Sequence, residues 1–265
     1  MTKTQIAIHG AAGRMGRRLV ALGAADPELQ IVAALDSPNS PQLGQDAGLI
    51  AGIAELGLPI SGERNFRAQA VIDFSVPEAA AEITQLCAQA GLPLVLATTG
   101  LTAAFRESLV KASETIPVVW SPSMSLTVNL AMKLCAMAGS ALKDNASGVD
   151  VEIIERHHRF KEDAPSGTAL KFGEIIAGVM GQYQHQHGRQ GATGKRPMNE
   201  IGYHAVRTGD NPGEHTIVFG LLGESLEITV KASNRDCYAL GALAAAKFVA
   251  HQKPGLYSMY DVLGL

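Results

Sequence analysis

Short apolar runs alternate with helical patterns through the first half of the chain. Residues 5–9 form an apolar run that ends at a glycine, and residues 13–22 then place apolar side chains at helical spacing. Further strands are predicted at 30–35, 70–74, 93–97 and 118–120, and further helices at 77–90 and 102–114. This alternation predicts an α/β fold that begins with a Rossmann-like, doubly wound parallel sheet.

The pattern changes after residue 127, which indicates a second domain. A long apolar helix is predicted at 128–142, a strand at 149–155 and another helix at 168–180. A polar, glycine-rich loop follows at 181–199, and strand-like runs come after it at 201–207, 215–219 and 226–232. This order predicts an α+β domain with an antiparallel or mixed sheet.

A final amphipathic helix is predicted at 235–251 and is expected to rejoin the first domain. The expected division is a first domain at 1–127, a second at 128–236 and a carboxyl-terminal return at 237–265. Because the chain would then cross twice between the domains, we expect a cleft that closes about hinges near 127–130 and 236–240.

Composition and charge narrow the class of protein. The 265 residues are 46% hydrophobic and include 28 glycines, as expected of a globular α/β enzyme. A net charge of −3 argues against nucleic acid, because phosphate binding requires a broad basic surface. Cys87, Cys135 and Cys237 lie in apolar surroundings and are expected to be reduced thiols. The first ten residues lack a signal-peptide pattern, and no apolar run approaches the ~20 residues of a membrane span, so we expect a cytoplasmic protein.

A glycine-rich turn joins the first predicted strand to the first helix. Its residues 10–16 (GAAGRMG) have the spacing GxxGxxG, and Asp36 ends the second predicted strand. Glycines allow a tight turn, helix N–H groups bind a pyrophosphate, and an acidic residue at the position of Asp36 binds the adenosine ribose. The pattern therefore predicts dinucleotide binding, with an ordinary strand-to-helix turn as the alternative.

Two further features concern which dinucleotide is bound and where else it is contacted. Asp36 is followed by Ser37 rather than by a basic residue, so the usual partner of an NADP 2′-phosphate is missing there, although Arg14 could substitute. We therefore expect NADH to be used at least as well as NADPH. Residues 97–100 (ATTG) carry a strand end into a loop of small residues, which predicts a second cofactor contact, although an ordinary turn has the same pattern.

The segment 155–168 (ERHHRFKEDAPSGT) concentrates the chemistry of the second domain. His157 and His158 place two adjacent imidazoles in it, and an ordinary imidazole titrates near neutral pH. Fixed positive charges lie beside them on Arg156, Arg159 and Lys161. The segment follows an apolar strand, and its Pro-Ser-Gly-Thr turn presents N–H groups at the start of a helix. It predicts a site for a small anion with acid–base capacity, against the alternative of a solvated charged loop.

Together these segments resemble the dihydrodipicolinate reductases of bacterial lysine biosynthesis, also called 4-hydroxy-tetrahydrodipicolinate reductases. The resemblance rests on GAAGRMG, ATTG and ERHHRFKEDAPSGTA, and it continues in order through GQDAG (44–48), GATGKR (191–196), VRTG (206–209), GEHT (213–216) and LEITVKAS (226–233). It implies an NAD(P)H-dependent oxidoreductase that reduces 4-hydroxy-tetrahydrodipicolinate to tetrahydrodipicolinate with loss of water, in the diaminopimelate route to lysine. It also implies a homotetramer, in which domain 1–127 binds the dinucleotide and domain 128–236 binds a small dicarboxylate and builds the oligomer.

The resemblance further implies roles for individual residues. His157 would donate and accept the proton, Lys161 would be the second catalytic group, and the substrate would contact His158, Gly167 and Thr168. The pyrophosphate loop would consist of Gly10, Ala11, Ala12, Gly13, Arg14 and Met15, with Asp36 on the ribose. The other cofactor contacts would come from Ala97, Thr98 and Thr99, and from Ser121, Pro122, Ser123 and Met124.

Two other classes of protein fit part of the sequence. Another two-domain NAD(P) dehydrogenase, acting on an amino acid or a semialdehyde, would share the glycine turn but not the HHxxK segment followed by PSGTA. A regulator that senses NAD(P) without turnover would have no use for two imidazoles and a lysine beside an anion-binding turn. His185 and His187 lie in a polar loop with no Cys or carboxylate ligand nearby, so we expect no metal site.

Overall fold

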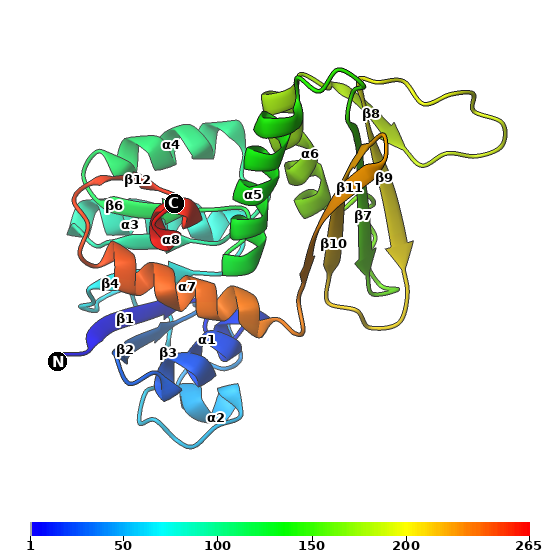
Figure 1. The fold of residues 1–265 in the computed structure, drawn as a ribbon. Helices are drawn as coiled ribbons and strands as arrows, with labels where there is room; N and C mark the ends of the chain where they lie inside the picture. Colours follow the sequence, from blue (N-terminus) through cyan, green and yellow to red (C-terminus); the bar gives the residue numbers. More distant parts are fainter. Residues whose placement is uncertain (1) are drawn as a thin grey trace. The chain divides into compact units, whose positions relative to one another are not determined.

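The computed structural model describes residues 2–265, which divide into two compact units. Unit 1 comprises the residues up to Leu126 together with Arg235–Leu265, and unit 2 comprises Thr127–Asn234. Figure 1 labels the helices and strands of both units. No helix in residues 2–265 combines the length and the apolar character needed to cross a membrane.

Unit 1 is built on a seven-stranded parallel sheet. Its strands are β1 (Thr4–His9), β2 (Leu29–Leu35), β3 (Ile60–Ser61), β4 (Ala70–Asp73), β5 (Leu94–Leu96), β6 (Pro117–Trp120) and β12 (Gly255–Tyr257). They run in the order β12-β6-β5-β4-β1-β2-β3, and every adjacent pair is parallel. The chain order reverses at β1, which has β2 on one side and β4 on the other. Doubly wound sheets bind ligands at the carboxyl edge beside such a reversal.

Helices cover both faces of this sheet (Figure 1). They are α1 (Arg14–Ala25), α2 (Ala47–Ala51), α3 (Pro77–Ala90), α4 (Ala103–Ser113), α7 (Asp236–Val249) and α8 (Met259–Leu263). Because side chains alternate along a strand, Ile6 and Ile8 of β1 pack in one apolar cluster, with Leu19 of α1 and Leu243 of α7. Ala7 packs in the other cluster, which α3 and α4 line.

Unit 2 is built on a five-stranded mixed sheet. Its strands are β7 (Asp150–His157), β8 (Gln184–His187), β9 (Glu200–Arg207), β10 (Glu214–Leu221) and β11 (Glu224–Lys231), in the order β11-β10-β7-β9-β8. The central strand β7 is parallel to β9 and antiparallel to β10. The helices are α5 (Leu126–Leu142) and α6 (Gly167–Met180). The predicted fold class, a Rossmann-like parallel sheet followed by an α+β domain with a mixed sheet, is confirmed.

The two faces of β7 have different surroundings. Val151, Ile153, Glu155 and His157 are buried, whereas the residues between them are partly or fully exposed. The carboxylate of Glu155 accepts a hydrogen bond from the N–H of Ser166, directly before α6, so the buried face is the one that α6 covers. The strand predicted at 149–155 extends two residues further, which places His157 on a rigid element instead of in the loop.

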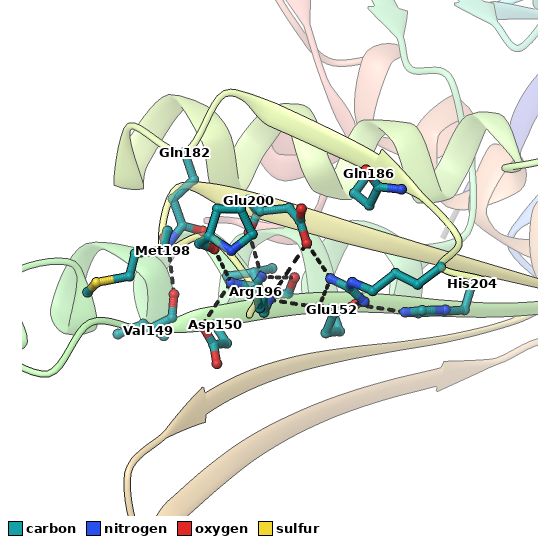
Figure 2. Close-up of polar contacts among 12 residues, drawn as sticks. Val149, Asp150, Glu152, Gln182, Gln186, Arg196, Met198, Glu200 and His204 are labelled. Carbon is teal, nitrogen blue, oxygen red and sulfur yellow. Dashed lines mark hydrogen bonds and ion pairs between the residues drawn. The ribbon is translucent and has the colours of Figure 1, made fainter. Parts of the chain in front are cut away.

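The opposite face of β7 carries a network of charged side chains (Figure 2). Glu152 accepts hydrogen bonds from Arg189, Arg196 and His204, at nitrogen–oxygen distances between 2.7 and 3.1 Å. Burial alone would raise the pKa of Glu152, but these bonds hold it at about 2. Since the two arginines belong to the segment between β8 and β9, the network fastens that segment to the sheet.

The prediction of a loop throughout 181–199 is wrong, because β8 lies within it. β8 pairs in parallel with β9, but its sequence Gln-His-Gln-His has no apolar alternation to reveal a strand. Backbone pairing holds this edge strand, together with the stacking of His185 and His187 on Tyr203. The sequence patterns also missed β3, β12, α2 and α8, each of which has five residues or fewer.

Candidate active site

His157 is the last residue of β7 and forms a short hydrogen bond with Glu155. The two residues are separated by one position on the strand, so their side chains lie on the same face. The Nδ1 atom of His157 lies 2.6 Å from Oε2 of Glu155. A carboxylate only accepts, so Nδ1 carries the proton of this bond and Nε2 is the atom left for proton exchange.

Glu155 is completely buried and accepts three further hydrogen bonds from two other residues of unit 2. Arg207 donates two hydrogen bonds to the two carboxylate oxygens, at 2.7 and 2.8 Å, and the N–H of Ser166 donates a third at 3.0 Å. Burial alone would raise the pKa of Glu155, but the bonds from Arg207, His157 and Ser166 lower it below its ordinary value. Glu155 is therefore a fixed carboxylate that orients the imidazole of His157.

Burial lowers the pKa of His157, although Glu155 acts in the opposite direction. Lys161 and Arg207 add repulsion that lowers it further. The imidazole is therefore neutral near pH 7, and an anion bound beside it would favour its protonated form. A Cβ atom at Gly213 would stand 3.0 Å from Nε2, so the glycine keeps that side of the ring open.

The amino terminus of α6 offers N–H groups to an anion. Ser166 caps the helix, since its Oγ accepts a hydrogen bond from the N–H of Ala169 and its carbonyl one from Leu170. The N–H groups of Gly167 and Thr168 have no acceptor among residues 2–265. A Cβ at Gly167 would meet nothing within 4 Å, so a ligand can approach closely. These N–H groups and the helix dipole suit a carboxylate.

Lys161 and His158 supply further polar groups in the same segment. The Nζ of Lys161 lies 2.8 Å from Oδ1 of Asp163, an exposed residue whose pKa the lysine lowers. The Nδ1 of His158 is buried without a hydrogen-bond partner in the described part of the chain. A buried nitrogen without a partner is costly unless a ligand satisfies it. Both groups therefore fit the binding of an acid with more than one carboxylate.

His215 on β10 supports this arrangement as a neutral residue. Its Nε2 lies 3.0 Å from Oγ of Ser166, and its ring meets the ring of His157 edge-on at a centroid distance of 5.2 Å. Burial, with repulsion from His157, lowers the pKa of His215 to about 4. At neutral pH the ring is a hydrogen-bond partner that fixes the Ser166 cap and carries no charge.

Acid is expected to destabilise the protein through His215. Its pKa is lower in the folded chain than the ~6.5 of an unfolded chain, so protonation favours unfolding, and stability falls as the pH drops from about 6.5 towards 4. Between about pH 7.5 and about pH 5 the loss should be about 2 kcal/mol. Urea unfolding at about pH 7.5 and about pH 5 should show this loss in the wild type and a smaller one in His215→Asn. Equal losses in both proteins would assign the effect to other groups.

The glycine loop of unit 1 makes a tight backbone turn between β1 and α1. Gly10 has a φ of +81°, and a Cβ there would lie 2.7 Å from the carbonyl oxygen of Phe74, while a Cβ at Gly16 would lie 2.0 Å from that of Gly10. Only glycine fits either position. Asp36 follows β2, and its Oδ2 accepts a hydrogen bond of 2.7 Å from the N–H of Ala12. The acidic residue and the loop are thus held together.

The other two proposed cofactor segments follow β5 and β6 at the carboxyl edge of the same sheet. Ala97 and Thr98 are buried and Thr99 is exposed. In the later segment, Ser121 donates a hydrogen bond of 2.8 Å to the carbonyl of Ser123, and Met124 is buried in the core of unit 1. Met15 is partly buried against that core, while Arg14 and Pro122 are exposed.

Four residues of the site in unit 2 were not predicted: Glu155, Ser166, Arg207 and His215. Glu155 had a local signal, because alternation on a strand puts it beside His157. Arg207 and His215 lie about 50 positions away along the chain, and only strand register brings them in. Arg207 is paired with His157 across β9 and β7, and His215 with Glu155 across β10 and β7.

Comparisons with known proteins agree on one family. The family model described as "Dihydrodipicolinate reductase, N-terminus" matches residues 4–124, and the model described as "Dihydrodipicolinate reductase, C-terminus" matches residues 127–263. The chain is 61% identical to the 4-hydroxy-tetrahydrodipicolinate reductase of Rhodopirellula baltica, over 98% of this chain and 96% of the relative. It is 48% identical to that of Alkalilimnicola ehrlichii, over 99% of each chain.

Solved structures give the same result at the level of the fold. Dipicolinate-bound dihydrodipicolinate reductase from Paenisporosarcina sp. TG-14 matches with a TM-score of 0.80 and 25% identity, over 98% of this chain and 99% of that one. An amine dehydrogenase from Mycobacterium smegmatis matches with a TM-score of 0.67 over 97% of this chain and 95% of that one. At 13% identity, this second likeness shows a shared fold alone.

Proposed function

This chain belongs to the dihydrodipicolinate reductase family, and from that membership we propose how its residues divide the work of the reaction. The enzyme is an NAD(P)H-dependent oxidoreductase that reduces 4-hydroxy-tetrahydrodipicolinate to tetrahydrodipicolinate with loss of water, in the diaminopimelate route to lysine. The observation that supports the assignment of roles best is the buried Glu155–His157 pair beside the amino terminus of α6.

The dinucleotide is held by unit 1 in this proposal. The glycine loop suits a pyrophosphate, because Gly10 and Gly16 allow the tight backbone turn that leads into the amino terminus of α1, and Asp36 suits the adenosine ribose. The segments 97–99 and 121–124 would complete the binding of the cofactor. When bound, the reduced nicotinamide supplies the hydride. That NADH serves at least as well as NADPH stays a prediction.

The dicarboxylate is held by unit 2. The N–H groups of Gly167 and Thr168 would bind one carboxylate, where the dipole of α6 adds to the attraction. Lys161 would contribute a point charge, and the buried Nδ1 of His158 would find its missing partner in the substrate. Binding would thus satisfy the N–H groups of Gly167 and Thr168 and the Nδ1 of His158, which have no hydrogen-bond partner in the described part of the chain.

His157 would supply the proton through Nε2. Glu155 fixes the tautomer by accepting from Nδ1, and it stabilises the imidazolium with its negative charge. The bound carboxylates would raise the pKa of the imidazole from its lowered value, so the acid form would be populated when substrate is present. One hydride and one proton enter, and the 4-hydroxyl group leaves as water.

We further propose a cytoplasmic homotetramer built through the sheet of unit 2. β11 is exposed along most of its length, and two apolar side chains are exposed here: Leu222, in the turn before β11, and Leu226, within it. A further copy of the chain on this sheet would bury that surface. Sedimentation equilibrium should give four times the chain mass of 27.8 kDa; a monomer at assay concentration would contradict the proposal.

A coupled assay tests the function. Pyruvate and aspartate semialdehyde would be supplied with the preceding synthase, and the oxidation of NADH or NADPH would be followed by absorbance. We expect consumption of reduced nucleotide that depends on the synthase and on this protein. No consumption with either nucleotide would reject the proposed function.

Replacing Lys161 with alanine is expected to damage both kinetic constants. The change removes a charge that attracts the dicarboxylate, so KM for the substrate should rise, and it removes acid assistance, so kcat should fall. Together we expect kcat/KM to decrease by about 10²-fold or more. Lys171→Ala is a suitable control, because Lys171 pairs with Glu174 on the exposed surface of α6. Wild-type kinetics in Lys161→Ala would remove the lysine from the mechanism.

A further inference from the structure

A buried polar cluster lies at the carboxyl edge of the sheet in unit 1. Asp73, the last residue of β4, has no exposed surface, and His9, the last residue of β1, is almost completely buried. One oxygen of the Asp73 carboxylate lies 2.6 Å from Nδ1 of His9 and accepts a hydrogen bond of 2.6 Å from Oγ of Ser75. The other accepts a hydrogen bond of 2.5 Å from Oγ1 of Thr98.

This cluster connects the carboxyl-terminal ends of three adjacent strands. β1, β4 and β5 are neighbours in the sheet, and register pairs His9 with Asp73 and Asp73 with Leu96. The backbone adds bonds from the N–H of Phe74 to His9 and from the N–H of Ala97 to Asp73. A buried carboxylate is costly unless its oxygens are well satisfied, and apolar side chains would pack an ordinary sheet edge at less cost. The cluster therefore indicates that the segments that follow these three strands must be held in fixed positions.

Asp73 connects two of these segments, and they are the proposed cofactor loops: the glycine loop after β1 and the segment 97–99 after β5. Gly10 follows His9 directly and lies against the carbonyl of Phe74, so the segment after β4 packs against the glycine loop. Thr98 is the middle residue of the segment 97–99. Because its hydroxyl donates its proton to Asp73, Thr98 cannot use that hydroxyl to donate to a ligand.

We propose that Asp73 is a positioning residue that fixes the glycine loop, through His9, and the segment 97–99, through Thr98, in the relative placement that the dinucleotide requires. This inference rests on the proposed roles of these two loops. It predicts that the hydroxyl of Thr98 contributes to cofactor affinity without touching the cofactor. It also predicts that the substrate site in unit 2 is unaffected.

The chain contains a matched control for the test. Thr84 on α3 is as buried as Thr98, and its hydroxyl also donates a short hydrogen bond, to the carbonyl of Ala80. Thr98→Val and Thr84→Val therefore remove the same group from equally buried positions in the same unit. Thr98→Ser restores the hydroxyl at the tested position.

NADH affinity of the full-length protein, measured by titration calorimetry, is the primary readout. We expect Thr98→Val to raise the Kd for NADH about tenfold, the effect of losing one hydrogen bond to a charged group. Thr84→Val and Thr98→Ser should stay near the wild-type value. In steady-state assays the loss should appear in KM for NADH more than in kcat, with KM for the dicarboxylate unchanged.

Two results would overturn the proposal. One is an unchanged Kd for NADH in Thr98→Val, and the other is an equal rise in both valine variants, which would mark a general effect on the fold. If Thr98→Val does not fold, two variants of His9 provide the test instead. His9→Asn keeps a donor near the position of Nδ1 and should bind NADH normally, whereas His9→Leu should bind it more weakly; equal affinities in these two would also overturn the proposal. A wild type that binds NADH but shows no turnover would instead count against the proposed function.

Discussion

Replacing His157 with glutamine is expected to lower kcat by about 10²- to 10⁴-fold, the usual contribution of a positioned acid or base. Glutamine fills much of the same space, but its amide cannot transfer a proton to the substrate. KM should change little, because the proposed carboxylate contacts lie on Gly167, Thr168 and Lys161. Steady-state kinetics with the coupled supply of substrate would measure both constants.

The pH profile separates loss of the proton from loss of structure. The wild-type kcat/KM should fall as the pH rises through the pKa of His157, because only the protonated ring is an acid. Burial lowers this pKa below ~6.5, so the decline should begin on the acid side of neutrality. His157→Gln should lose this dependence while its unfolding midpoint stays close to that of the wild type. Full activity in the variant, or an unchanged profile, would contradict the assignment.

Local patterns were sufficient to predict the elements that carry most of the proposed site. The strand–glycine–helix order around Gly10 follows from chain geometry, since a tight turn with positive φ and close backbone approach accepts only glycine. The start of α6 follows from the Ser-Gly-Thr sequence, because a serine before a helical pattern acts as its cap. In both places the information lies within about ten residues of the chain.

The environment of His157 could not be predicted in the same way, because it depends on strand register. Arg207 and His215 belong to β9 and β10, and nothing in their local sequence states which residue of β7 each one faces. A shift of either strand by one residue would turn its side chain to the opposite face. The sequence patterns therefore pointed to the segment with the two imidazoles, but not to Arg207 and His215, which lie beside the proposed proton donor.

The same limit applies to unit 1. Asp73 lies within the strand predicted at 70–74 and was given no role, although its carboxylate connects the two proposed cofactor loops. Its partner His9 ends β1 and its partner Thr98 follows β5 by two residues, so the cluster exists only because β4 lies between these two strands. Strand order is a property of the whole sheet, and short apolar runs do not specify it.

Replacing Glu155 with glutamine is expected to lower kcat by about 10²-fold or more, without removing any group that touches the substrate. An orienting carboxylate beside a catalytic imidazole can contribute up to about 10⁴-fold, because it fixes the tautomer and stabilises the imidazolium. Glutamine cannot balance the charge of Arg207, and its amide can turn a donor towards Nδ1 of His157. Breaking this buried pair should also lower the free energy of unfolding by about 3 kcal/mol.

Glu152→Gln is the control that separates these two effects. Glu152 stands three positions earlier on β7, and it also binds arginines and a histidine, but it lies on the opposite face of the strand (Figure 2). Glu152→Gln should therefore lose stability while it keeps kcat near the wild-type value. Glu155→Gln should in addition shift the decline of kcat/KM to lower pH, because Glu155 raises the pKa of His157 against the effect of burial. If both variants lose stability alone and keep both kcat and the pH profile, Glu155 has only a structural role and His157 acts without an orienting carboxylate.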